Sequence, residues 1–165
     1  MDRGAGPEPL DAVVSADPPS ELGPAAGLRD GNDSYRAILD PCAAALGIDG
    51  VSMLGSCDLA LGDRKFSGSA QKRNRWCLLH QGTLLYDFDL ALIPLYLGQP
   101  EKQPDYRRQR AHLDFVVNLP LDAATLRERI AAAWDAVGAA ENWEPPGLEA
   151  LLEKKYRNRE WIERF

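Results

Sequence analysis

A tight turn between two short extended runs is the feature that most restricts how this chain can fold. Asp58–Leu61 and Arg64–Phe66 flank the dipeptide Gly62-Asp63. A glycine at the first turn position is typical of a two-residue β-hairpin. The following stretch, RWCLLHQGTLLYDFDL, is rich in strand-forming residues and predicts two further extended pieces, interrupted at Gln81-Gly82. These runs predict a sheet built from neighbouring strands.

Helical patterns lie on both sides of these strands. Tyr35, Ile38, Cys42 and Leu46 recur at helical spacing, and Gly47 is placed to end that helix. The following segments are also expected to carry short elements: a short helix around Pro94, a strand at Phe115–Val117, a helix over 121–138 capped by Asp122, and a last helix from Leu148 to Tyr156. The order predicts an α+β, or α/β, fold with a mixed sheet and flanking helices.

Composition separates the chain into two parts. Residues 1–32 are rich in Gly, Pro, Ala and Asp and carry few large apolar groups, so we expect a disordered leader. Residues 33–165 are expected to form one domain. The net charge of −6 argues against general nucleic-acid binding, and the basic runs at 72–75 and 107–110 are read as solvated loops. We expect no membrane span, because no apolar run is long enough for one.

Cysteine and histidine usage indicates the compartment and argues against a structural metal. Three cysteines without a CxxC pair, and only two histidines, make a structural zinc site improbable. Free thiols fit a reducing environment, so a cytoplasmic location is expected. No metal ligand is assigned from these residues.

Lys65 is the first candidate for chemistry. It is followed by Ser67-Gly68-Ser69-Ala70, whose small side chains leave backbone amides accessible to an anion. An ammonium beside such donors suits a phosphate or an activated carboxylate, although the same pattern also describes an ordinary turn. Four other residues each allow a functional and a structural interpretation. His80 could be an acid–base group or a structural residue, and Gly82 a close-approach site or a bulge. Cys57 could be a nucleophile or a core residue, and Asp58 a ligand contact or a strand cap.

Three motifs together resemble the lipoate–protein ligase family, part of the biotin/lipoate ligase superfamily. They are Asp58-Leu59, Arg64-Lys65-Phe66-Ser67-Gly68-Ser69-Ala70, and His80-Gln81-Gly82-Thr83-Leu84-Leu85. In the family these correspond to an Asn-Asp-Leu strand, Arg-Lys-φ-Ser-Gly-x-Ala (φ apolar) and His-His-Gly-Thr-Leu-Leu. The ending LEKKYRNREW resembles the Lys-Tyr-x-x-x-x-Trp close of the catalytic domain. The resemblance therefore covers roughly residues 33–165.

The resemblance implies a ligase that attaches lipoyl or octanoyl to a lysine of a lipoyl domain. That domain would belong to a 2-oxoacid dehydrogenase or a glycine-cleavage protein. Lipoate or octanoate would be the acyl substrate, activated by ATP and Mg²⁺ to an acyl-adenylate. Lys65 would contact the acyl carbonyl and the phosphate and stabilise the charge that develops there. The adenylate pocket would be lined by Cys57, Asp58, Ser67, Gly68, Ser69, Ala70, His80, Gln81, Gly82 and Thr83.

The sequence also departs from the family pattern. Cys57 stands where many relatives have Asn, and Gln81 stands where the second His is found. Nothing in residues 1–32 resembles the family's Arg-Arg-x-x-Gly-Gly-Gly segment. We therefore expect an incomplete domain, equivalent to the C-terminal portion of the family's catalytic domain, and we do not expect this chain to be active by itself. Two alternatives stay open. One is an octanoyltransferase working through a thioester on Cys57 or Cys77, and the other is a non-catalytic half that binds a partner chain, such as a separate N-terminal half.

Overall fold

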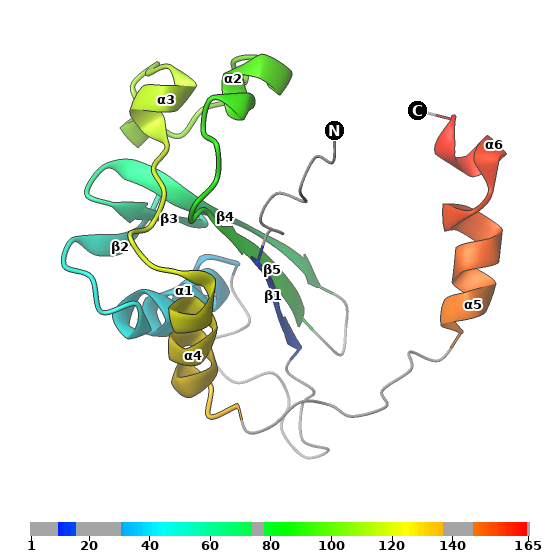
Figure 1. The fold of residues 1–165 in the computed structure, drawn as a ribbon, viewed down its shortest axis with the longest axis horizontal. Coiled ribbons are helices and arrows are strands. Elements are labelled where there is room, and N and C mark those ends of the chain that lie inside the picture. Colours follow the sequence, from blue (N-terminus) through cyan, green and yellow to red (C-terminus); the bar gives the residue numbers. More distant parts are fainter. Residues whose placement is uncertain (1–9, 16–30, 74–77, 137–146, 165) are drawn as a thin grey trace, which may run out of the picture.

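The computed structural model describes residues 10–15, 31–73, 78–136 and 147–164 (Figure 1). The strands are β1 (Leu10–Ser15), β2 (Val51–Leu54), β3 (Asp58–Leu61), β4 (Arg64–Arg73) and β5 (Leu78–Leu84). The helices are α1 (Gly31–Ala45), α2 (Leu92–Tyr96), α3 (His112–Phe115), α4 (Ala123–Ala133), α5 (Leu148–Leu151) and α6 (Arg159–Ile162). A 3₁₀ turn covers Asp105–Arg107, and a π-helical segment covers Leu152–Tyr156.

The strands form one sheet in the order β1-β5-β4-β3-β2, and every ladder in it is antiparallel. Two isolated parallel bridges, Lys65–Val116 and Tyr86–Leu119, tie the later chain to the sheet. Helices α1 and α4 lie together on one side, whereas α2 and α3 lie beyond the ends of β3 and β4 (Figure 1). The predicted α+β class with flanking helices is confirmed.

The predicted hairpin is present, with Gly62 at a φ of 62° in the turn between β3 and β4. The register shifts after it, because Ala60 faces Lys65 while Leu59 faces Ser67, so Phe66 is left as a bulge residue. The predicted interruption at Gln81-Gly82 is wrong. Both residues lie inside a continuous β5, because the long β4 opposite supplies a ladder partner for each of them.

The prediction of a disordered leader over 1–32 is corrected at two places. Leu10–Ser15 forms β1, which pairs with all but one residue of β5, and α1 already begins at Gly31. The unpaired edge of β5 offers backbone partners that composition alone does not reveal. The remaining parts of that segment, 1–9 and 16–30, lie outside the described residues.

The core lies between the sheet and the α1–α4 layer. Its buried members are Leu39, Leu46, Leu59, Phe66, Leu119 and Leu126. As predicted, α1 ends at a left-handed Gly47, whose amide donates to Ala44 O, and the Asp122 carboxylate caps α4 by accepting from Thr125 N at 2.8 Å. The Arg129 guanidinium of α4 donates to Leu46 O, which joins α4 to the end of α1.

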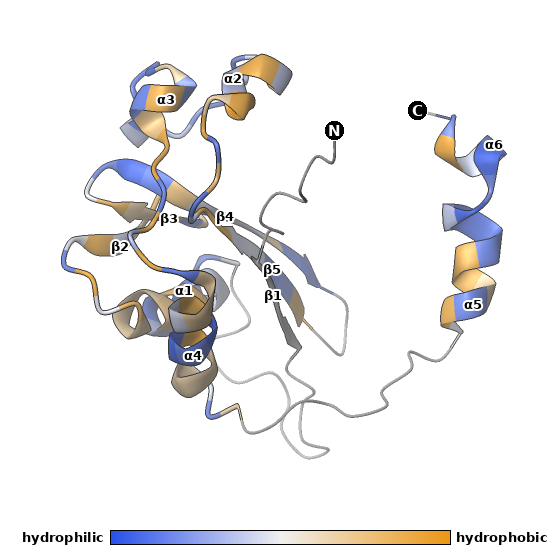
Figure 2. Cartoon of the chain, viewed as in Figure 1, coloured by the Kyte–Doolittle hydropathy of each residue, from blue (hydrophilic) through white to orange (hydrophobic). Residues whose placement is uncertain are grey.

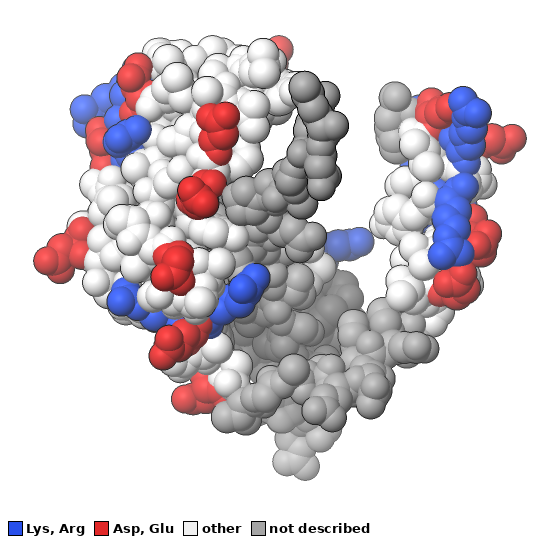
Figure 3. Space-filling view, in the orientation of Figure 1, with Lys and Arg blue, Asp and Glu red and all other residues white. Residues whose placement is uncertain are grey.

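The region after β5 carries short elements with exposed apolar side chains. The predicted helix near Pro94 is α2, whose Leu95 and Tyr96 are exposed, and Figure 2 shows much of it as hydrophobic. A strand was predicted at Phe115–Val117, but Phe115 ends α3 and Val116 contributes only a bridge. The C-terminal segment 147–164 shows basic and acidic side chains side by side on its surface (Figure 3). Among the described helices, none has the length and apolarity to cross a membrane.

Candidate functional site

The Lys65 ammonium is held in place by an ion pair. It lies on the face of the sheet opposite α1 and α4, which we call the open face. Its Nζ lies 2.7 Å from Asp58 Oδ1, and the two side chains are 30% and 10% exposed. Asp58 Oδ2 accepts a second hydrogen bond, of 2.7 Å, from the Tyr106 hydroxyl. Burial and the bond to this carboxylate raise the pKa of Tyr106, so the phenol stays protonated as a donor. The lysine is therefore positioned by a chain of two hydrogen bonds.

Gly68 leaves room for this lysine. A Cβ built on Gly68 would lie 3.2 Å from Lys65 Nζ and 3.4 Å from its Cε, so the lysine end lies directly over the glycine. Gly68 pairs with Asp58 on one side and with Thr83 on the other, and Thr83 Oγ1 lies 3.5 Å from Gly68 O. The ammonium thus lies against bare backbone, at a place where a bound group can approach closely.

Strand alternation divides the predicted site residues between the two faces of the sheet. Asp58, Lys65, Gly68, Ala70, Gln81 and Thr83 lie on the open face, which follows from their pairing. Ser67, Ser69, His80 and Gly82 lie on the opposite face, toward α1 and α4, and line a cavity of about 40 Å³ with residues of those helices. The prediction that all of these residues line one pocket is therefore corrected.

Of the four residues on the helix side, His80 belongs to a buried polar layer. His80 is 4% exposed, and its Nδ1 lies 3.2 Å from Gln71 Nε2. Gln71 Oε1 accepts from Ser34 Oγ, which also receives a bond from Arg73. Burial lowers the pKa of His80, so the imidazole is held neutral. This layer supports the sheet from behind and does not reach the ammonium of Lys65.

The loop at 107–110, predicted to be solvated, contributes to the open face. Arg107 is 4% exposed; its guanidinium bonds to Gln99 Oε1 and to Arg110 O, and lies 4.7 Å from the centre of the Phe115 ring. Arg110 forms a 3.0 Å ion pair with Asp63 in the hairpin turn. These contacts fix the turn that presents Tyr106 to Asp58. The aromatic residue directly before the basic run in DYRRQR was the available signal for a packed loop.

The cysteines do not form a nucleophilic pair with histidine in the described structure. Cys42 accepts a hydrogen bond from Trp134 Nε1 at 3.4 Å, and burial raises the pKa of its thiol. Cys57 is a free, half-buried thiol just before β3. The two histidines bond instead to Gln71, Arg107 and Gly98, and Cys77 lies outside the described residues.

The open face does not carry a donor set suited to magnesium. Both carboxylate oxygens of Asp58 already accept hydrogen bonds, from Lys65 and Tyr106. Within the described ranges there is no group of three His, Cys, Asp or Glu side chains that could hold a metal ion. Magnesium prefers a nearly complete shell of oxygen ligands, so this face by itself does not fit the ion.

Comparison with known proteins gives a consistent family and fold. The family model for the lipoyl protein ligase A/B catalytic domain matches residues 26–133. A bi-partite lipoate protein ligase of Thermoplasma acidophilum, described with its E2 lipoyl domain, aligns with a TM-score of 0.60 and 18% identity over 92% of this chain and 61% of that chain. A putative lipoate protein ligase of the same organism with bound lipoic acid aligns with a TM-score of 0.60 and 17% identity, over 92% and 62%.

A third solved structure extends the likeness to a nucleotide-bound ligase. Lipoate-protein ligase A bound with ATP aligns with a TM-score of 0.56 and 19% identity, over 92% of this chain and 62% of that chain. At these identities the likeness shows the fold, and the chain spans about three fifths of the length of these ligases. A search of the curated proteins returns no match.

Proposed function

The chain belongs to the lipoyl protein ligase A/B catalytic domain family, and we propose that it acts in the ATP-dependent attachment of lipoyl or octanoyl groups to a lysine of a lipoyl domain. The observation that carries the proposal is the placement of Lys65, whose ammonium lies over Gly68 and is held by Asp58. A fixed cation beside open backbone suits an anionic, carbonyl-containing intermediate.

The proposed reaction has two steps that place charge at the same point. The acyl carboxylate first attacks the α-phosphorus of ATP, which forms the acyl-adenylate and releases pyrophosphate. The amine of the acceptor lysine then attacks the acyl carbonyl, loses a proton, and AMP leaves. Negative charge develops on oxygen in both steps, and the Lys65 ammonium would stabilise it. A single contact of this kind typically contributes about 2.7–4 kcal/mol to lowering the barrier.

The other residues of the open face receive supporting roles in the proposal. Asp58 and Tyr106 keep Lys65 extended over Gly68 and so limit the reorganisation needed when the intermediate binds. Gln81 and Thr83 are exposed beside this point and would contact the bound adenylate. The residues on the other face would not contact the adenylate; they are Ser67, Ser69, His80 and Gly82.

The span of the chain shapes the proposal in one further way. The solved ligases extend well beyond the part that this chain covers, and one of them is bi-partite. We therefore assign to this chain the part of the site around Lys65. The prediction that it needs a separate N-terminal half, or acts as a binding partner only, is tested by measuring ATP-dependent acyl transfer to a lipoyl domain by this chain alone.

The assignment of Lys65 is tested by calorimetric titration with a stable acyl-adenylate analogue. We expect the wild-type chain to bind the analogue and Lys65→Ala to lose roughly 100-fold or more in affinity, the equivalent of about 2.7 kcal/mol. Lys154→Ala, on the far C-terminal helices, is the matched control and should bind as the wild type does. Equal binding by Lys65→Ala and Lys154→Ala would contradict the role given to Lys65.

A further inference from the structure

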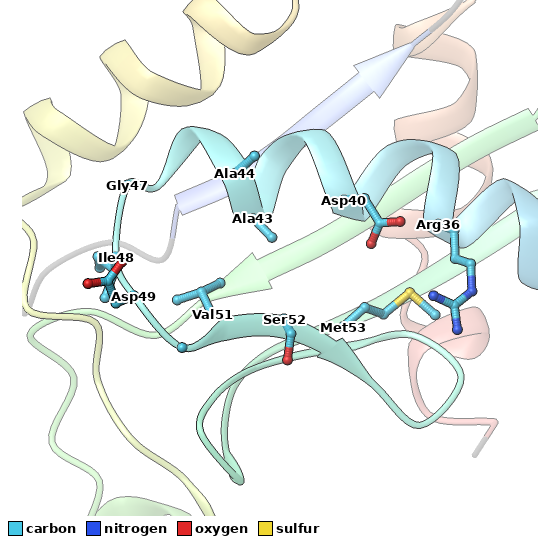
Figure 4. A pocket seen from close by; sticks show the side chains of 11 residues that line it. Arg36, Asp40, Ala43, Ala44, Gly47, Ile48, Asp49, Val51, Ser52 and Met53 are labelled. Carbon is cyan, nitrogen blue, oxygen red and sulfur yellow. The ribbon is translucent and has the colours of Figure 1, made fainter.

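The outer edge of β2 lies beside a cavity that is separate from the proposed site. A groove of about 530 Å³ runs between α1 and β2, with Arg36 and Asp40 on the helix, Asp49 after it, and Val51 to Met53 on the strand (Figure 4). β2 is the last strand of the sheet, and no other described strand pairs with its outer side. The groove is therefore bordered by a strand edge that can accept another strand.

The backbone of β2 has a defined hydrogen-bonding direction. Gly62 N donates to Gly50 O across the β2–β3 hairpin. In an antiparallel ladder this direction alternates, so Ser52 also faces β3, whereas Val51 and Met53 turn their backbone groups to the outer side. The Val51 amide already bonds to Ile48 O at 3.3 Å, which leaves Met53 N–H as the outward donor and the carbonyl oxygens of Val51 and Met53 as outward acceptors.

Apart from its short length of 4 residues, the strand lacks the features that usually protect an edge. Its sequence, VSML, contains no charged residue and no proline. Glycines with positive φ, Gly50 and Gly55, lie at its two ends, so the strand begins and ends at turns. Such an edge can pair with a strand of similar length.

The charges around the groove have a self-complementary arrangement. Arg36 lies at the Met53 end of the groove, and Asp49 lies at the opposite end, beside Val51 (Figure 4). Within the described part of the chain, neither has an ion-pair or hydrogen-bond partner. When two copies of β2 run antiparallel about an axis through Ser52, the Arg36 end of each copy meets the Asp49 end of the other.

We propose that the β2 edge is a dimerisation surface on which a second copy of this chain pairs through its own β2. Met53 N–H of each copy would donate to Val51 O of the other, and Arg36 of each would pair with Asp49 of the other. The two-fold axis stands perpendicular to the sheet, so both α1 helices lie on one side and cover the groove. Asp40 lies on α1 one helical turn after Arg36, a spacing at which opposite charges attract. This proposal does not depend on the proposed ligase function.

A charge swap on the full chain tests the proposal by sedimentation equilibrium. We expect the wild type to dimerise, and Arg36→Asp or Asp49→Arg alone to raise the dimer dissociation constant about tenfold, because each replaces two attractive pairs by repulsive ones. The double variant Arg36→Asp/Asp49→Arg restores opposite charges and should return to wild-type affinity. Arg127→Asp is the control. Arg127 is exposed on α4, away from the β2 edge, so this variant should leave dimerisation unchanged.

A backbone test separates strand pairing from charge alone. Met53→Pro removes both the methionine side chain and the outward N–H. Met53→Ala removes the side chain but keeps the N–H. We expect Met53→Pro to abolish the dimer and Met53→Ala to retain it, with circular dichroism confirming that both fold. A wild-type chain that stays monomeric, or a dimer unaffected by these variants, would overturn the proposal. A complex with a lipoyl domain that replaces the dimer and is lost in Met53→Pro would also overturn it, and would assign the edge to the acceptor.

Discussion

The two faces of the central sheet are made by the same strands and have opposite physical character. On the helix side, Ser67, Ser69 and His80 are packed beneath α1, and the imidazole is held neutral. On the open side, Lys65 and Asp58 form an ion pair that water still reaches, since the lysine side chain is 30% exposed. The same strands therefore supply a buried structural layer on one face and a charged, accessible surface on the other.

The comparison shows how strand geometry assigns roles within a motif. Successive residues on a strand point to opposite faces of the sheet. The side chains of a run such as Lys65–Ala70 therefore alternate between the two faces, apart from the bulge at Phe66. Polar groups on the buried face must find partners within the protein, whereas those on the open face remain available to a ligand. Proximity in sequence to Lys65 is thus no measure of proximity to its chemistry.

The largest effect that would break this comparison is expected from His80→Leu. The substitution leaves Gln71 Nε2 without its partner in a buried layer, which should lower the free energy of unfolding by about 1–3 kcal/mol. Thr83→Ala, on the exposed face of the same strand, should change it by less than about 0.5 kcal/mol. Urea denaturation of both variants measures the difference. Equal stabilities would show that the two faces do not differ as described.

Local signals in the sequence were sufficient for the hairpin, the end of α1 at Gly47 and the Asp122 cap, because each depends on residues close in the chain. Lys65 was singled out from its small neighbours, and the structure places its ammonium over Gly68, whereas its chemical role stays a prediction. Arg107 was missed although its partners Gln99 and Phe115 are near in sequence, because only the folded loop brings them together. Tyr106 was missed because its partner Asp58 lies far away in sequence. The pairing of β1 with β5 was missed for the same reason.

A matched pair of glycines sharpens the comparison. A Cβ at Gly68 meets Lys65 Nζ at 3.2 Å, and a Cβ at Gly82 meets Ser69 Oγ at 3.1 Å on the other face. Neither glycine requires a positive φ. Gly68→Ala should displace the ammonium and weaken binding of the acyl-adenylate analogue about tenfold, part of the contribution assigned to Lys65. Stability should change little, because the contacted atom ends a flexible side chain.

Gly82→Ala is the control for that experiment. Its Cβ pushes against a buried hydroxyl that has no described partner, so a small loss of stability is expected and binding of the analogue should be unchanged. Calorimetric titration and urea denaturation of both variants give the two readouts. Weaker binding by Gly82→Ala than by Gly68→Ala would place the ligand on the helix side and reverse the assignment of the faces.

The smallest expected effect is a pH dependence that comes from His80. Burial holds the pKa of His80 below the value of about 6.5 that it has in the unfolded chain. Between the folded and unfolded values the unfolded chain binds more protons, so the free energy of unfolding falls as the pH drops below about 6.5 and is fully retained above it. Urea denaturation from about pH 8 to about pH 5 should show this slope in the wild type and in Lys65→Ala. His80→Leu should lose it, because the group that takes up the proton is gone while the carboxylates and His112 remain. Parallel curves for the wild type and His80→Leu would show that His80 is not held neutral by the helix-side layer, and the contrast between the two faces would then lie in packing alone.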